Sequence, residues 1–142
     1  MKILRVLLPL GLLFAAPAFA GNEYEVCNTR MLAGRWMFAT DVGHQAIFPG
    51  GGNITAMGVF RFDRQGTLLD GVFDATVEKF RFLPGVTFTG SVVVNANCTG
   101  TLTFVTSAGT TRSDSIIVLG PGHVRGMSQD INNLWTYDMR RL

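Results

Sequence analysis

The sequence predicts an all-β protein, an eight-stranded antiparallel up-and-down barrel that follows a cleaved signal peptide. Two observations support this fold class. After residue 33, apolar and polar residues alternate with period two, and no segment keeps a helical apolar period beyond about one turn. Short turn sequences separate the runs, so consecutive strands can close into a barrel without an unpaired edge. A β-sandwich is the main alternative, but sandwiches generally need longer crossovers between their sheets.

The first 20 residues, MKILRVLLPLGLLFAAPAFA, have the pattern of a secretory signal peptide. Lys2 and Arg5 form the positive region, residues 6–16 form an apolar run, and residues 18–20 form an Ala-x-Ala cleavage site. The apolar run is shorter than the roughly 20 residues of a transmembrane helix. We therefore expect cleavage after Ala20 and a secreted or periplasmic protein, with a retained membrane anchor as the alternative.

Cleavage would leave a neutral chain. Two of the 12 lysines and arginines lie in the signal, so the remaining 122 residues carry 10 basic and 10 acidic side chains. This balance gives no electrostatic reason to expect a nucleic acid or an anionic membrane surface as a partner. A chain of this length makes one domain. We divide it into an N-terminal segment, residues 21–33, and a barrel domain, residues 34–142.

Cys27 and Cys98 are the two cysteines of the chain. In an exported protein they are expected to form a disulfide, because two cysteines in an oxidising compartment usually pair. The bridge would close a loop of about 70 residues, worth roughly 4 kcal/mol in the chain-entropy model. It would tie the segment 21–33 to a turn between two strands. Two free thiols are the alternative, and no histidine or other base lies near either cysteine to make it a nucleophile.

Eight alternating runs set the predicted strands. They span residues 34–42, 54–63, 67–82, 86–95, 99–107, 111–120, 123–130 and 134–142. In the third run the apolar positions change phase before Phe80 and Phe82, which predicts a bulge near residues 78–79. The sequence LPG at 83–85 is expected to break the chain before the fourth strand.

The third, fourth and fifth predicted strands each have an apolar face and a polar face rich in Thr, Ser, Asp or Glu. The apolar faces consist of Leu69, Gly71, Phe73, Ala75, Val77, Val86, Phe88, Gly90, Val92, Val94, Gly100, Leu102 and Phe104. In a barrel in water these faces point inward. Eight strands enclose an interior that side chains just fill or that holds one small ligand. Glycines beside phenylalanine rings fit either a cavity or a filled core.

The candidate ligand-binding residues are the aromatic and late-strand residues expected in the lumen. They are Trp36, Phe38, Phe60, Phe73, Phe88, Phe104, Arg125 and Tyr137. The late strands also carry the polar or amphipathic residues Arg112, Asp114, His123, Gln129 and Trp135. His123, Arg125, Met127 and Gln129 share one face, and Trp135, Tyr137 and Met139 share another. Facing inward, an arginine with a tyrosine and a carboxylate would bind an acidic head group or stabilise an enolate. An ordinary solvated outer wall is the interpretation that we favour.

Residues 42–53, VGHQAIFPGGGN, form the longest predicted connection. Its three successive glycines are costly to order, and a long first loop over a barrel mouth is a natural lid. His44, Ile47 and Phe48 are the candidate lid residues, and an exposed tolerant loop is the alternative. His44 and His123 lack acidic residues at ligand spacing, so we expect no metal and no cofactor. No Ser/His/Asp order, paired carboxylates or Gly-x-Ser-x-Gly elbow is visible, so no catalytic residue is assigned.

Gly34 and Trp36 form a G-x-W pattern that resembles the first strand of lipocalins and other calycins. In that group the tryptophan closes the barrel floor, often under an arginine from a late strand. The resemblance makes Arg125, Arg140 and Arg141 the candidate partners of Trp36.

A broader resemblance covers most of the chain after the signal. The order of GRWMF, GVFRFDRQG, FTGSVVVNANCTGTLTF, IIVLGPGHVRGMSQD and a last strand ending in arginines resembles small secreted bacterial proteins with an allene-oxide-cyclase-like barrel. Val92 stands where their hairpin pattern, G-x-Y-x-V-N-x-x-C-T-G-T, often has tyrosine. The resemblance implies the barrel fold. The wider superfamily includes cyclases that fold a flexible lipid or polyketide chain in an apolar barrel, but no cyclase catalytic residue maps onto this chain.

The leading functional prediction is a secreted or periplasmic barrel that binds a small hydrophobic ligand or a partner protein, without turnover. One alternative is an isomerase or cyclase that acts on a flexible hydrophobic substrate through shape, desolvation and a polar group such as Arg125 or Tyr137. A second is a periplasmic inhibitor of a foreign enzyme that works through the loop AIFPGGGN. A third is an eight-stranded outer-membrane barrel. The short turns at both ends and the final MRRL argue against it, so we expect no stable membrane insertion.

Overall fold

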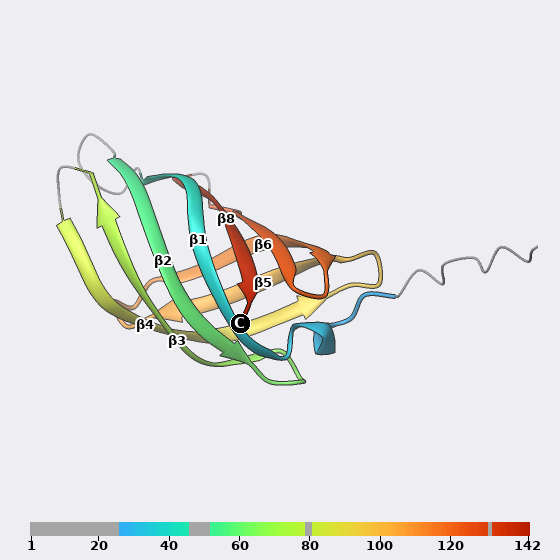
Figure 1. The fold of residues 1–142 in the computed structure, drawn as a ribbon. Helices are drawn as coiled ribbons and strands as arrows, with labels where there is room; N and C mark the ends of the chain where they lie inside the picture. Colours follow the sequence, from blue (N-terminus) through green and yellow to red (C-terminus); the bar gives the residue numbers. More distant parts are fainter. Residues whose placement is uncertain (1–25, 46–51, 79–80, 131) are drawn as a thin grey trace, which may run out of the picture.

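The computed structural model describes residues 26–45, 52–78, 81–130 and 132–142, which form a single closed barrel after one short 3-10 helix (Figure 1). The elements are η1 (Thr29–Leu32), β1 (Gly34–Gln45), β2 (Gly52–Phe62), β3 (Thr67–Val77), β4 (Arg81–Val94), β5 (Thr99–Thr106), β6 (Thr111–Gly120), β7 (His123–Ser128) and β8 (Asn133–Arg141). Each strand pairs antiparallel with the next, and β8 pairs with β1 to close the ring. The predicted all-β, eight-stranded up-and-down barrel is confirmed.

The up-and-down order sends alternate connections to opposite ends of the barrel (Figure 1). At one end, the closed end, lie η1, the β2–β3, β4–β5 and β6–β7 turns and the end of β8. At the other end, the mouth, lie the β1–β2, β3–β4, β5–β6 and β7–β8 connections.

Trp36 and Arg141 hold the closed end together. The Trp36 side chain is fully buried, and its Nε1 donates a hydrogen bond to the Leu32 carbonyl of η1 at 2.7 Å. The Arg141 guanidinium lies 5.0 Å above the Trp36 ring, within range of a cation–π interaction. It also donates hydrogen bonds to the carbonyls of Ala33, at 3.0 Å, and Met31. Of the three candidate arginines, Arg141 is therefore the one that covers this tryptophan.

The predicted disulfide between Cys27 and Cys98 is present, with Cα atoms 4.9 Å apart. It joins the segment before η1 to the β4–β5 turn, where Cys98 has a left-handed backbone (φ 67°). A second tie lies beside it, because the Thr29 hydroxyl accepts a hydrogen bond from the Val94 amide at 3.0 Å. The described part of the N-terminal segment, residues 26–33, is thus anchored to the closed end by the predicted disulfide.

The predicted boundary between the third and fourth strands is wrong. β3 ends at Val77 and β4 begins at Arg81, so the chain reverses where a bulge was expected. Phe82 is 59% exposed instead of continuing the apolar face, and Phe80 lies outside the described residues.

The sequence LPG at 83–85 lies inside β4 and does not break the chain. The pairing of β3 with β4 shifts register at this point, which forms a bulge. Gly85 supplies the left-handed conformation that the bulge requires (φ 62°), and its amide donates to the Asp74 carboxylate at 2.7 Å.

A second bulge corrects one predicted core position. Arg61 pairs with Asp70, but Phe62 pairs with Leu68, so Leu69 is the extra residue on β3. Leu69 is consequently 46% exposed, whereas Leu68 is buried. Beyond the bulge, β3 follows the predicted alternation.

The core is the barrel interior. It contains the buried residues of the predicted apolar faces of β4 and β5, together with residues from every other strand. The buried hydrophobic residues are Cys27, Leu32, Trp36, Ile54, Ala56, Phe60, Phe62, Leu68, Ala75, Val77, Phe88, Val92, Val94, Leu102, Phe104, Ile116, Val118, Val124, Trp135, Tyr137 and Met139.

Glycines in the wall make room for the aromatic rings. A Cβ at Gly71 would collide with the Phe88 ring, and one at Gly126 would collide with the Tyr137 ring. The glycines therefore relieve crowding around a filled core instead of leaving an open cavity.

Candidate functional site

Polar side chains gather inside the mouth half of the barrel, on β6, β7 and β8. Period-two alternation along β6 directs Arg112, Asp114, Ile116 and Val118 inward, so the lumen changes from polar near the mouth to apolar near the closed end. We call the buried polar and amphipathic residues of this region the mouth cluster. Its members are Arg112, Asp114, Ser128, Asn133, Trp135 and Tyr137.

Trp135 lies at the centre of the mouth cluster. The Arg112 guanidinium lies 5.0 Å from the centre of the Trp135 ring, and Phe104 stacks on the same indole with ring centres 6.4 Å apart. The indole Nε1 donates a long hydrogen bond, 3.5 Å, to Oδ1 of Asp114. One aromatic side chain thus positions both charged groups of the cluster.

Several buried polar atoms of the cluster lack hydrogen-bond partners among the described residues. They are Nη1 of Arg112, Oδ2 of Asp114, Oδ1 of Asn133 and the hydroxyl of Tyr137. Leaving a buried polar atom unpaired costs about 1–3 kcal/mol, and more for a charged group. Native proteins usually satisfy such atoms with ordered water or a bound molecule.

The burial of Asp114 changes its acid–base behaviour. Burial raises the pKa of Asp114 to about 6. The Tyr137 hydroxyl, which is close to this carboxylate but outside hydrogen-bond geometry, acts in the opposite direction, as do the Trp135 indole and the charge of Arg112. Burial, together with the Asp114 charge, holds the pKa of Tyr137 well above its ordinary value. Burial lowers the pKa of Arg112, and the negative charges of Asp114 and Asp130 act against this shift. Asp114 is therefore a carboxyl group that changes charge in mildly acidic solution.

Two hollows adjoin the cluster. The inner hollow lies in the lumen, and the volume open to the centres of water molecules is only about 30 Å³. A single water needs roughly 10–15 Å³ of such volume. It is lined by Phe38, Thr40, Phe60, Phe73, Phe88, Leu102, Phe104, Asp114, Trp135, Tyr137 and Met139. The lumen can therefore take a few waters at most.

The second hollow, which we call the mouth depression, is much larger, with about 240 Å³ by the same measure. It is lined by Ile54, Phe73, Ala75, Leu83, Val86, Thr106, Ala108, Thr110, Arg112 and Trp135. Most of these side chains are apolar, and Arg112 is the charged residue among them. Trp135 and Phe73 separate the mouth depression from the inner hollow, since they contribute to the lining of both.

Most of the predicted ligand-binding residues face the lumen. Their role in binding a ligand stays a prediction. Phe38, Phe60, Phe73, Phe88, Phe104 and Tyr137 line the inner hollow. Trp36 is buried at the closed end and lines neither hollow.

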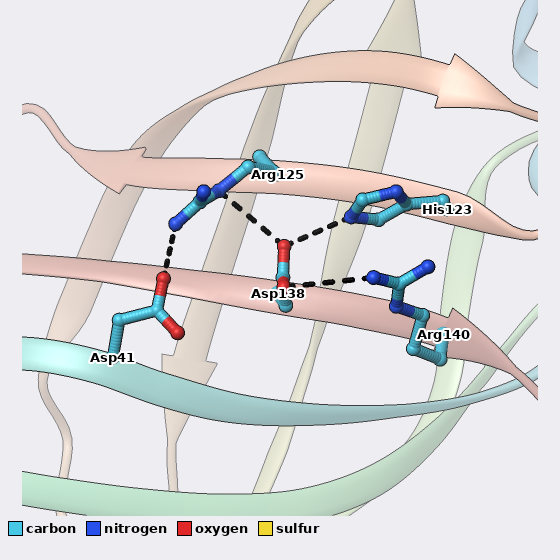
Figure 2. Close-up of polar contacts among 5 residues, drawn as sticks. All are labelled: Asp41, His123, Arg125, Asp138 and Arg140. Carbon is cyan, nitrogen blue, oxygen red and sulfur yellow. Dashed lines mark hydrogen bonds and ion pairs between the residues drawn. The ribbon is translucent and has the colours of Figure 1, made fainter.

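Arg125 is the exception, because its side chain lies on the outer wall (Figure 2). Its guanidinium pairs with Asp41 of β1 and, at 3.3 Å, with Asp138 of β8. The same Asp138 carboxylate contacts His123 Nε2 at 2.9 Å and Arg140 at 3.8 Å. Val124, Gly126 and Ser128 occupy the inward positions of β7 instead. The assignment of Arg125 to the lumen is wrong, and its face is the solvated wall that we favoured.

The predicted lid is only partly described. His44 belongs to β1, where it is exposed and pairs with Asn53 of β2, so the strands extend into the predicted loop. Ile47 and Phe48 lie outside the described residues. Within the described ranges, no group of three or more His, Cys, Asp or Glu side chains is arranged to hold a metal ion. Among the same residues, no helix is long and apolar enough to cross a membrane.

Sequence reasoning missed the mouth-side polar residues Ser128, Asp130 and Asn133. The Asp130 carboxylate accepts hydrogen bonds from the Asn133 side chain and, at 2.9 Å, from the Asn132 amide, which shapes the β7–β8 connection. Asn133 lies two residues before Trp135, so it could have been placed on the same inward face from period two alone.

Comparisons with known proteins show the fold class and no family. No family model and no curated protein matches the chain. Among solved structures, the chain is similar to a redesigned β barrel, b11L5F_LGL, with a TM-score of 0.57 and 14% identity over 80% of this chain and 94% of that one. It is also similar to a de novo designed fluorescence-activating β barrel, with a TM-score of 0.56 and 14% identity over 80% and 96% of the two chains.

A third similar structure is the redesigned β barrel mFAP1 bound to DFHBI, with a TM-score of 0.56 and 19% identity over 80% and 97% of the two chains. These identities are too low to show more than a shared barrel architecture. The resemblance to allene-oxide-cyclase-like proteins gains no support from them.

Proposed function

We propose that this protein binds a small apolar molecule at the barrel mouth, without turnover. The observation that carries the proposal is the mouth depression, whose mainly apolar wall includes Arg112, a buried residue whose Nη1 atom has no hydrogen-bond partner among the described residues. Small-molecule sites generally combine such an apolar hollow with a few convergent polar groups. The deeper lumen is filled by aromatic side chains, so the ligand would lie at the mouth and not in the middle of the barrel.

The fold is compatible with this function. The mFAP1 structure holds DFHBI in a barrel of similar architecture, a fact about that designed protein alone. Towards its closed end the interior of the present barrel is filled by apolar side chains, and its outer wall mixes Thr, Ser and charged residues with exposed hydrophobic ones such as Met57, Val59 and Ile117. The filled apolar interior argues against an outer-membrane barrel, which has a polar interior.

An isomerase or cyclase is less well supported than a binding protein. A reaction inside the barrel would need space for a flexible substrate, and the inner hollow holds only about 30 Å³.

The Cys27–Cys98 disulfide supports an oxidising compartment. We therefore place the protein outside the cytoplasm, secreted or periplasmic, with the signal cleaved after Ala20.

The proposal can be tested with prodan, a small neutral dye whose fluorescence rises in apolar sites. Purified residues 21–142, with the disulfide intact, should bind prodan saturably with one site per chain. Val86→Phe should abolish binding because Val86 lines the mouth depression. Thr87→Phe is the matched control, since the neighbouring side chain is exposed on the outer wall. An absence of saturable binding, or equal binding by both variants, would contradict the proposal.

A further inference from the structure

We propose that the ligand of the mouth depression carries a single carboxylate and that Arg112 anchors it. This inference rests on the proposed function, because it names the chemical class of the molecule that the mouth site takes. The geometry places one buried cation in the lining of a mainly apolar hollow, which is the complement of an apolar acid.

The first reason to expect an anionic ligand is the environment of the Arg112 guanidinium. Its side chain is only 8% exposed, yet it forms no ion pair within 4.0 Å among the residues that the structure describes. Among the described residues its buried Nη1 atom has no hydrogen-bond partner, and the guanidinium lies against the face of Trp135. A buried charge is normally paired, since removing it from water is costly. A carboxylate or a phosphate fits the planar guanidinium well, because either group can accept two parallel hydrogen bonds from it.

The surroundings favour a monoanion over a phosphate or another dianion. One arginine lines the mouth depression, and the remaining lining residues are apolar or carry only a hydroxyl or indole group. Two carboxylates, Asp114 and Asp130, already lie near enough to act on the Arg112 charge. A dianion would meet too little positive charge, whereas a neutral alcohol could accept a hydrogen bond but would leave the guanidinium charge without a counter-ion.

The titratable groups around Arg112 would also make binding depend on pH. Asp114 of β6 and Tyr137 of β8 line the inner hollow on the other side of Trp135, and Asp130 lies in the β7–β8 connection. The hydrogen bonds from Asn133 and Asn132 lower the pKa of Asp130, so it stays ionised throughout the range of interest. Asp114 becomes neutral as the pH falls through about 6, which removes a negative charge that otherwise acts on the Arg112 guanidinium and competes with an incoming carboxylate. Binding should therefore tighten in mildly acidic solution.

A matched pair of probes separates charge from apolar contact. Octanoate and octan-1-ol have the same chain length, and isothermal titration of the disulfide-bonded protein would measure both at pH 5.5 and pH 7.5. Octanoate should bind at least about tenfold more tightly than octan-1-ol at pH 5.5, the size expected for a charge-assisted hydrogen bond. The preference should shrink at pH 7.5.

Two variants assign the effect to residues. Arg112→Gln should remove the preference for octanoate and keep the binding of octan-1-ol, which also shows that the mouth still folds. Asp114→Asn should keep the preference and remove its dependence on pH. Equal affinity of the native protein for the two probes, or an unchanged preference in Arg112→Gln, would overturn the inference and leave the proposed function intact. Failure of both probes to bind the native protein would overturn the proposed function itself.

Discussion

Replacing Asp114 by asparagine should raise the free energy of unfolding at pH 8 by about 3 kcal/mol. The carboxyl group has a pKa of about 6 in the folded protein, against an ordinary value of 3.8. The folded protein therefore holds this proton more tightly than the unfolded chain does. Above pH 6 the charged carboxylate therefore destabilises the fold, and the stability of the protein increases as the pH falls from about 6 towards 3.8. Asparagine keeps the oxygen that accepts the Trp135 hydrogen bond but never becomes charged.

The measurement is urea denaturation of both proteins at pH 5, 6, 7 and 8, followed by far-ultraviolet circular dichroism. The difference between variant and native protein should fall from about 3 kcal/mol at pH 8 to roughly half that value at pH 5. Taking the difference cancels the other titrating groups, which both proteins share.

Asp70→Asn provides the charge-matched control on the outer wall. Asp70 is exposed and pairs with Arg61 at 2.7 Å, so its loss should cost at most about 1 kcal/mol. A difference for Asp114→Asn that stays constant from pH 5 to pH 8, or a less stable variant at pH 8, would refute the reasoning about this buried carboxyl group.

Three further changes test the packing of the barrel, each by urea denaturation. Replacing Cys27 and Cys98 with serine should cost about 4 kcal/mol, because the bridge closes a long loop; a loss below about 1 kcal/mol would contradict this. Gly126→Ala should cost about 1–3 kcal/mol of stability, because the added methyl group would displace the Tyr137 ring. Gly120→Ala is the control and should cost less, since the space beside Gly120 is open. Equal costs for the two variants would argue against the ring contact. Arg141→Met should cost about 2 kcal/mol through the lost carbonyl hydrogen bonds and ring contact, and an unchanged stability would remove Arg141 from the closed end.

The strands that could be predicted are those in which alternation runs without interruption. β6 was predicted at residues 111–120 and is observed at Thr111–Gly120. Period two is a local property of an extended chain, so the residues themselves carry the information.

The two bulges could not be predicted, because they depend on contacts between strands. Leu69 becomes exposed only because Phe62 pairs with Leu68 across the sheet. The bulge at residues 83–85 depends on the Asp74 carboxylate of the neighbouring strand, 11 residues away, which accepts the Gly85 hydrogen bond. Nothing in a single strand shows which register its neighbour will adopt.

The candidate site was only partly within reach of the sequence. The sequence predicts a larger set of late-strand polar and amphipathic residues, for which we favoured a solvated outer wall. That interpretation is right for Arg125. It is wrong for four members of the set that are buried inside the barrel, which are Arg112, Asp114, Trp135 and Tyr137. Arg125 was nevertheless also a candidate lumen residue, because β7 has no clear apolar face from which to choose its inward side. The structure resolves this through Gly126, since the ring of Tyr137 needs the space that only a glycine leaves on the inner wall.

The most direct test of the central claim, that the mouth of the barrel binds an apolar acid, uses the two tryptophans of the chain. Trp135 lines the mouth depression, whereas Trp36 is buried at the closed end, so their indole N–H signals report on the two ends separately. We would titrate ¹⁵N-labelled protein with octanoate at pH 5.5 and follow both signals. Binding of octanoate at the barrel mouth should shift the Trp135 signal saturably and leave the Trp36 signal unmoved. A stationary Trp135 signal, or a shift confined to Trp36, would contradict it.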